Sequence, residues 1–168
     1  VVNHGPQAKS VGQNSLDMGA ELYRQGQFVE ARDAFKKATE MDPALLKAWE
    51  NLGWADYKLG DYDTALKTWQ MLLKVTPGNK VLFNAIAETQ IKMSFWQDAI
   101  ITLNKSLQLE PEQAQVHSQL AIAYQQEKQY DAAIRHHQRS FKIDPENHHS
   151  ILHLADIYQQ QGQQNLAV

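Results

Sequence analysis

Four prolines recur along this chain at a constant interval of 34 residues. They are Pro43, Pro77, Pro111 and Pro145, and each ends a similar six-residue segment. A fixed interval of this length is typical of repeat proteins, in which each repeat is a supersecondary structure that packs on its neighbours. With proline at position 32, the repeats are 12–45, 46–79, 80–113, 114–147 and a partial 148–168, preceded by a lead-in segment at 1–11.

Within each repeat the apolar residues follow the helical period in two stretches. In the second repeat these stretches begin near Trp49 and Tyr62, and Gly60 lies in the turn between them. Position 20 is alanine in every repeat and position 8 is always glycine or alanine, so two helix backbones can approach closely. Glycine at position 15 (Gly26, Gly60 and Gly162) suits a helix end that requires a positive φ. The residue before each proline is pushed out of the α region. Each repeat is therefore predicted to be a pair of antiparallel helices.

The pattern Trp49-x-x-Leu-Gly-x-x-x-Tyr-x-x-Gly-x-Tyr-x-x-Ala-x-x-x-Trp69, closed by Pro77, resembles the tetratricopeptide repeat (TPR) family. The resemblance covers residues 12–168 and implies an all-α, right-handed superhelical solenoid of antiparallel helix pairs. In proteins of this family an extended peptide or a partner helix lies on the inner, concave face. The resemblance therefore implies a protein-binding groove.

Several local departures from the family pattern carry expectations of their own. Position 15 is Ser94 and Lys128 in the third and fourth repeats. His117 and His137 occupy core positions of the fourth repeat, whose interior is expected to be wetter and looser. The fifth repeat stops at Val168, seven residues into its expected second helix, so the intact protein is expected to continue. The uncovered first helix, with Leu154, Ala155 and Tyr158, is expected to promote self-association.

Positions 2, 5, 9, 12 and 13 of each first helix face away from its partner helix on a helical wheel and are expected to line the groove. The candidate peptide-binding residues are Tyr23, Arg24, Lys47, Glu50, Trp54, Tyr57, Lys58, Val81, Asn84, Glu88 and Ile91. Trp54 is the most informative of them, because packing within its own helix pair does not require a tryptophan at position 9 and aromatic side chains are frequent binding hot spots. The alternative is that Trp54 packs against a helix of the neighbouring repeat.

Composition disfavours several classes of function. Sixteen Lys plus Arg against nineteen Asp plus Glu give a formal charge of -3, whereas nucleic-acid binding requires an excess of basic residues. A helical-repeat RNA reader is disfavoured for the same reason, since acidic residues offset Arg24, Lys47, Lys58 and Lys92 in the groove. No apolar run approaches the roughly 18 residues of a membrane helix, so no direct membrane insertion is expected. The absence of cysteine excludes disulfides, cysteine-ligated zinc and a thiol nucleophile.

No motif for catalysis or for a cofactor is present. The sequence has no phosphate-binding loop, and its serine, histidine and aspartate residues are spread over repeat surfaces. Five of the seven histidines lie at 136, 137, 148, 149 and 153. His149 and His153 have the i, i+4 spacing of a chelating pair, but two ligands do not make a metal site. We therefore expect a protein that is not an enzyme and that holds no cofactor and no metal.

The sequence predicts a protein–protein interaction scaffold or adaptor that binds a peptide or a partner helix in its concave groove. One alternative is a self-assembling scaffold, a homo-oligomer formed through the exposed C-terminal end, and another is a non-catalytic TPR segment of a larger enzyme. Relatives that capture the acidic tail of chaperones use basic and amide side chains at defined repeat positions. Only Asn51 fits that pattern here, so no binding of such a tail is expected.

Overall fold

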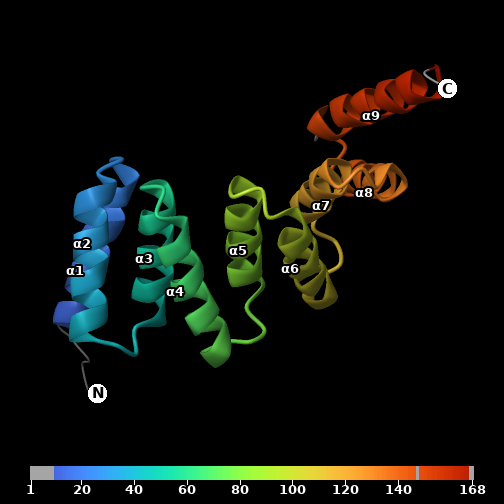
Figure 1. The fold of residues 1–168 in the computed structure, drawn as a ribbon. Coiled ribbons are helices and arrows are strands. Elements are labelled where there is room, and N and C mark those ends of the chain that lie inside the picture. Colours follow the sequence, from blue (N-terminus) through green and yellow to red (C-terminus); the bar gives the residue numbers. More distant parts are fainter. Residues whose placement is uncertain (1–9, 147, 167–168) are drawn as a thin grey trace. The chain divides into compact units, whose positions relative to one another are not determined.

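The computed structural model describes residues 10–146 and 148–166, apart from the side chains of 148, 149 and 163–166. Every regular element in this part of the chain is an α-helix (Figure 1). The helices divide into two compact units, one ending at Pro77 and the other beginning at Gly78. We call these units the N-terminal half and the C-terminal half, and each is described by itself.

The N-terminal half holds two helix pairs, α1 (Val11–Arg24) with α2 (Phe28–Met41) and α3 (Leu46–Lys58) with α4 (Tyr62–Val75). Each helix packs on the next, and Figure 1 shows α1 and α2 side by side. Small residues at position 8 allow large side chains of the second helix to come close. A Cβ atom added to Gly53 would lie 2.3 Å from Nε1 of the buried Trp69. Glycine at this position is therefore a packing requirement of the pair.

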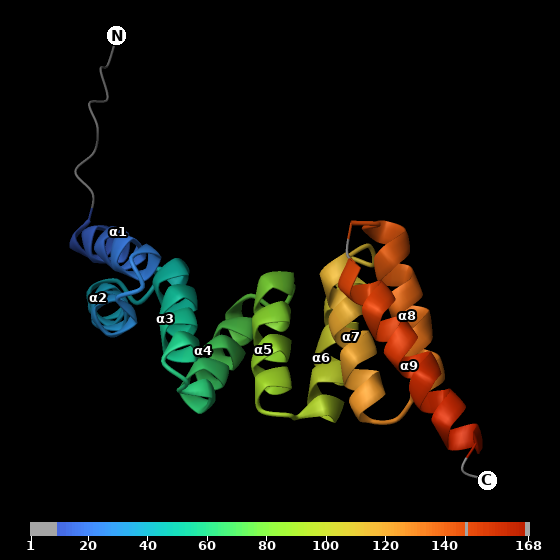
Figure 2. The same ribbon diagram turned by 90° about the horizontal axis from the view of Figure 1, so that it is seen from above.

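The C-terminal half holds five helices: α5 (Lys80–Lys92), α6 (Trp96–Leu109), α7 (Ala114–Gln126), α8 (Tyr130–Ile143) and α9 (His148–Leu166). Each of them contacts the next along the chain, and Figure 2 shows α9 running beside α8. The core between α5, α6 and α7 is built from Ala87, Ile100, Leu103, Val116, Leu120 and Ala123. The helical arrangement of both halves confirms the all-α fold that the 34-residue period predicts.

The turn inside each complete pair has the same geometry in all four repeats. Position 15 adopts a positive φ whether it is Gly26 (79°), Gly60 (83°), Ser94 (60°) or Lys128 (58°). The next residue donates its N–H to the carbonyl five residues earlier, as Gln129 does to Tyr124 at 2.8 Å. This hydrogen bond defines the Schellman helix end. The third and fourth repeats thus keep the turn without glycine, at a cost of about 1 kcal/mol for each strained residue.

The expected turn at Gly162 does not form. Residues 148–166 make one continuous helix, α9, and Gly162 lies inside it. The helix continues beyond Gly162 to Leu166. Continuing α9 satisfies the backbone hydrogen-bonding groups of these residues at lower cost. The prediction of a helix end at Gly162 was therefore wrong, because that turn depends on the packing of the helix after it.

Candidate protein-binding site

The N-terminal half contains a mainly apolar pocket of about 440 Å³ between α1 and α3. It is lined by Ala20, Tyr23 and Arg24 of α1, Phe35 of α2, and Asn51, Trp54 and Lys58 of α3. Two repeat positions contribute from both helices: position 9 supplies Ala20 and Trp54, and position 13 supplies Arg24 and Lys58. The structure therefore brings together four of the predicted residues, namely Tyr23, Arg24, Trp54 and Lys58.

The core of the second helix pair holds the Trp54 ring in place. Its centroid lies 4.9 Å from that of Trp69 and 5.6 Å from that of Tyr57, in edge-to-face arrangements that aromatic rings prefer. Trp69 is fully buried, and its indole N–H donates to the carbonyl oxygen of Glu50 at 3.2 Å. Sequence reasoning treated Trp54 as unnecessary for packing within its own pair, and these ring contacts correct it. Trp54 packs on its own pair and also lines the pocket.

Tyr57 lies behind the pocket instead of on its surface. It is only 7% exposed, and its ring contacts Trp54, Trp69 and Tyr62. Position 12 lies at the edge of the expected groove face, and in this repeat three large aromatic rings close over it. Tyr57 therefore supports Trp54 from within the core and is not available as a groove contact.

The charged residues near the pocket differ in their pairing. Arg24 forms an ion pair with Glu21 on the same helix. Lys47 pairs with Glu50 at 2.9 Å, and neither residue lines the pocket. Within the described part of the chain Lys58 forms no ion pair, and its Nζ atom lies 6.0 Å from the centre of the Tyr57 ring. Lys58 therefore leaves a positive charge available at the pocket edge.

The remaining predicted residues lie on α5, in the C-terminal half: Val81, Asn84, Glu88 and Ile91. Val81 is exposed, whereas Ile91 packs against the core of this half. Asn84 donates its amide N–H to Gln113 Oε1 at 3.1 Å and accepts from Ser106 Oγ at 2.6 Å. This network joins α5 to α6 and to the start of α7, so Asn84 has a structural role in the packing of three helices.

Three further residues line the pocket: Ala20 occupies position 9, which the helical wheel placed in the groove, whereas Phe35 and Asn51 lie at positions that it did not. Phe35 belongs to the core of the first helix pair, and its ring, 1% exposed, also contributes to the pocket wall. Asn51 occupies position 6, which faces positions 9 and 13 of the preceding repeat. The comparison with binders of chaperone tails singled out Asn51 by its repeat position but did not assign it to this groove.

A buried carboxyl group lies on α3, the helix that carries Trp54. Asp56 occupies position 11 and is 3% exposed. The pKa of the Asp56 carboxyl is raised to about 6, mainly by burial and also by the negative charge of Asp61, and the positive charge of Arg32 opposes both effects. Sequence reasoning assigned Asp56 no role, because a single acidic residue in an apolar stripe carries no motif. Its ionisation affects the stability of the N-terminal half.

The described part of the chain lacks the features of two other kinds of site. None of its helices is long and apolar enough to cross a membrane. Its described side chains include no group of three or more histidine, cysteine, aspartate or glutamate residues placed to hold a metal ion. The candidate chelating pair His149 and His153 falls partly outside the described side chains, because that of His149 is not described.

The chain resembles curated proteins over part of their length. It is 31% identical to Protein DIA2 of Saccharomyces cerevisiae over 110 residues, which are 61% of this chain and 15% of that protein. It is 35% identical to the small glutamine-rich tetratricopeptide repeat-containing protein 2 of Mycosarcoma maydis over 69 residues, which are 41% of this chain and 20% of that protein. The chain thus matches a fifth or less of the length of these relatives.

Solved structures with the same fold have low sequence identity to this chain. A MamA fragment from Desulfovibrio magneticus RS-1 superposes with a TM-score of 0.85 at 20% identity, covering 93% of this chain and 88% of that one. A thermophilic TPR protein of Thermus thermophilus superposes with a TM-score of 0.71 at 22% identity, covering 90% and 84%. At these identities the likeness concerns the fold alone.

Family models identify the repeats directly. Models described as tetratricopeptide repeat match residues 22–89 and residues 114–147, which together make up more than half of the chain. The matched segments contain the complete pairs α3–α4 and α7–α8, with Gly53 and Ala121 at position 8 and Ala65 and Ala133 at position 20. The chain belongs to the tetratricopeptide repeat family.

Proposed function

We propose that this protein is a non-catalytic interaction scaffold that binds a peptide segment of a protein partner in the pocket beside Trp54. The observation that carries the proposal is a mainly apolar pocket whose Trp54 wall is fixed by the buried Trp69. A rigid aromatic wall loses little conformational entropy on binding, which is why such side chains dominate binding hot spots. Protein–protein interaction is also the general role of TPR proteins.

The pocket supports a ligand with one bulky apolar side chain. Its volume of about 440 Å³ lies within the range of small-molecule and side-chain pockets. An aromatic or large aliphatic group would contact the Trp54 and Tyr23 rings, and an aromatic pair of this kind contributes about 0.5–1.5 kcal/mol beyond its buried area. Lys58 adds a preference for a carboxylate next to this anchor.

A random linear-peptide phage library provides a defined probe for this site. Selection on the whole chain should enrich peptides that combine a large apolar residue with a neighbouring acidic residue. A synthetic copy of an enriched peptide then serves for titration calorimetry. An acidic chaperone-tail peptide without a bulky anchor serves as the negative control, because the basic and amide residues that would hold its carboxylates are missing from this chain.

Two tryptophans of α3 offer a matched pair of variants. Trp54 and Trp49 are both half-buried, but Trp49 donates its indole N–H to the Pro43 carbonyl at 3.1 Å and does not line the pocket. Trp54→Ala and Trp49→Ala should both lower the unfolding midpoint, because both remove packing contacts. Only Trp54→Ala should weaken peptide affinity, by about 30-fold or more, the loss that a 2 kcal/mol hot spot produces.

The proposal fails if the enriched peptides bind Trp54→Ala and the original chain equally well at a temperature where both are folded. Equal losses of affinity in the two variants would also contradict it, because they would show an effect of stability alone. Lys58→Gln, which leaves the aromatic wall intact, should weaken only those peptides that carry the acidic neighbour.

A second candidate function, self-assembly, is favoured by the surface of α9. Leu152 is 64% exposed, Tyr158 53% and Ile151 46%, so one helix presents three large apolar side chains to solvent. Burying such a surface against a second copy contributes about 25 cal/mol per Å². We propose that the chain self-associates through α9, and sedimentation equilibrium should show a dimer that Leu152→Glu abolishes. A chain that remains monomeric at high concentration would exclude this mode of assembly.

A further inference from the structure

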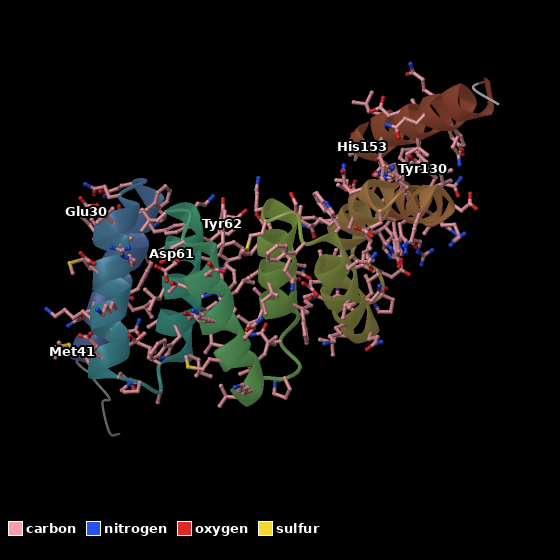
Figure 3. The ribbon with its side chains drawn as sticks, in the orientation of Figure 1. Glu30, Met41, Asp61, Tyr62, Tyr130 and His153 are labelled. Carbon is pink, nitrogen blue, oxygen red and sulfur yellow. The ribbon has the colours of Figure 1, made fainter. Side chains whose placement is uncertain are left out.

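Four histidines form two stacked pairs across the last three helices, one between α7 and α8 and one between α8 and α9. His117 of α7 lies with its Nδ1 atom 2.9 Å from Nδ1 of His136 on α8, and the two rings stack. The ring of the next residue, His137, stacks on that of His153 on α9, with centroids 5.2 Å apart and planes within 9°. Figure 3 labels His153 at the N-terminal part of α9, where this helix faces α8. We call His117, His136, His137 and His153 the histidine stack.

The hydrogen bonds of the His117 ring determine its tautomer. Its Nε2 atom lies 3.1 Å from the carbonyl oxygen of Pro111, which only accepts, so Nε2 carries the hydrogen. Trp49, at the same position of the second repeat, donates to the Pro43 carbonyl in the same way. In the neutral stack Nδ1 of His117 is therefore an acceptor, and Nδ1 of His136 donates to it. Protonating both rings would place two N–H groups and two positive charges 2.9 Å apart.

His137 has no compensation for a positive charge. It is fully buried, and neither of its ring nitrogens has a hydrogen-bond partner within the described part of the chain. The same position holds Phe35 in the first repeat and Trp69 in the second, and the Trp69 N–H reaches a backbone carbonyl. Histidine is shorter than tryptophan and finds no such carbonyl. The sequence led us to expect a looser interior in the fourth repeat. The structure instead shows a packed core position at His137, which accepts only the neutral imidazole ring.

The groups that face the stack reinforce this preference. The charges acting on His136 are those of His117 and Arg135, and the Tyr124 ring of α7 stacks on its imidazole. The charges acting on His137 are those of His153 on α9 and of His136. All of these charged groups are cationic or become so on protonation. The carboxylate of Glu112, which faces His117, is paired with Arg139.

We propose that the His137–His153 pair of the histidine stack is a pH-sensitive latch, which holds α9 on α8 while the His137 ring is neutral and releases α9 when this ring takes up a proton below neutral pH. Release would uncover the face of α8 that carries His137 and would allow its ring to be hydrated. The proposal concerns the C-terminal half and is independent of peptide binding at Trp54.

Proton linkage gives the size and the direction of the effect. Burial, followed by the neighbouring charges, lowers the pKa of His136 and that of His137 from 6.5 to about 4. Burial also lowers the pKa of His117. Opening of α9 exposes His137, whose pKa in the closed state lies below that of the open state, so the closing free energy is complete above about pH 6.5 and is lost as the pH falls toward 4. At about pH 5 protonation of this ring increases the opening constant about 30-fold.

Hydrogen exchange on the whole chain can measure this opening. Amide protection in α9 is compared at about pH 7.5 and about pH 5 after correction for the intrinsic exchange rate. Protection in α9 should fall at least 30-fold at the lower pH, the effect of one buried ring. Helices α1–α4 provide an internal comparison: residues 10–77 contain no histidine, and their protection should rise instead of falling at the lower pH, because the pKa of Asp56 is raised.

His137→Phe tests the assignment, because Phe35 shows that phenylalanine occupies this repeat position and can stack but cannot take up a proton. The loss of α9 protection at low pH should become about 30-fold smaller in this variant. If His137→Phe does not fold, His137→Leu serves, since Leu103 fills the same position of the third repeat. His4→Phe, the same substitution at the one histidine before residue 117, should leave the pH response unchanged.

Two results would overturn the proposal. One is a wild-type α9 that keeps its protection at about pH 5, and the other is a His137 variant whose α9 loses as much protection as the wild type does. An equal pH-dependent loss throughout α1–α9 would also contradict it, because that pattern indicates global acid unfolding.

Discussion

Asp56→Asn should stabilise the N-terminal half at neutral and alkaline pH. The Asp56 side chain is 3% exposed, and its pKa is raised from 3.8 to about 6. Above this pH the folded protein contains a buried carboxylate, which lowers the unfolding free energy of the N-terminal half. A rise of about two pKa units corresponds to about 3 kcal/mol. Asparagine has nearly the same shape as the protonated acid and cannot ionise. The variant should therefore gain up to about 3 kcal/mol of unfolding free energy near pH 8.

The direction of the pH dependence is opposite to the usual behaviour of a paired aspartate. The folded state binds the Asp56 proton more tightly than the unfolded state, whose pKa is near 3.8. The unfolding free energy of the N-terminal half therefore increases as the pH falls through 6, and this gain is lost again as the pH rises through 6. When the pH is lowered from about 8 to about 5, the unfolding free energy of the original chain should increase by about 1.4 kcal/mol. Asp56→Asn should show none of it.

Urea unfolding followed by tryptophan fluorescence provides the assay. Three of the four tryptophans, Trp49, Trp54 and Trp69, lie in the N-terminal half, so a Trp96→Phe background restricts the signal to that half. Asp63→Asn, an exposed neutralisation in the first turn of α4, is the matched control and should change the stability by less than about 0.5 kcal/mol. The reasoning is refuted if Asp56→Asn is no more stable than the original chain near pH 8.

Two glycine substitutions should have opposite effects. Gly53→Ala should lower the unfolding free energy of the N-terminal half by about 2 kcal/mol or more, because the new Cβ would lie 2.3 Å from Trp69 Nε1. The cost of this overpacking exceeds the gain of about 1 kcal/mol in helix propensity. Gly162→Ala has no neighbour within 4 Å and should stabilise α9 by about 0.5–1 kcal/mol, measurable by hydrogen exchange. A stabilised Gly53→Ala or a weakened α9 in Gly162→Ala would contradict this account.

The sequence predicted the helices and their turns because these depend on local periodicity. The constraint at position 15 shows this clearly, since Ser94 and Lys128 adopt the same positive φ as the glycines they replace. Gly162 was predicted incorrectly, because its turn depends on a second helix that must pack back on the first. The division into two halves at Pro77 was not predicted either, since the repeat pattern continues through it.

The candidate site was predictable to a smaller extent than the fold. Helical-wheel positions identified Tyr23, Arg24, Trp54 and Lys58 as side chains on one face, and all four line the pocket. They did not separate Trp54 from Tyr57, because the burial of Tyr57 results from three neighbouring rings and not from its repeat position. Whether this pocket binds a peptide is a prediction that the Trp54 variants test.

Two buried titratable side chains, Asp56 and His137, give the halves of this chain opposite responses to acid. Asp56 occupies an apolar position of the second repeat and His137 an aromatic position of the fourth, and burial favours the uncharged form of both. For a carboxyl group the uncharged form is the protonated one, whereas for imidazole it is the deprotonated one. Lowering the pH from about 7 to about 5 should therefore strengthen the half that carries the Trp54 pocket while it loosens α9. Peptide affinity at Trp54 should consequently persist at a pH where hydrogen exchange reports an open α9, and a simultaneous loss of both would indicate that the two halves do not respond independently.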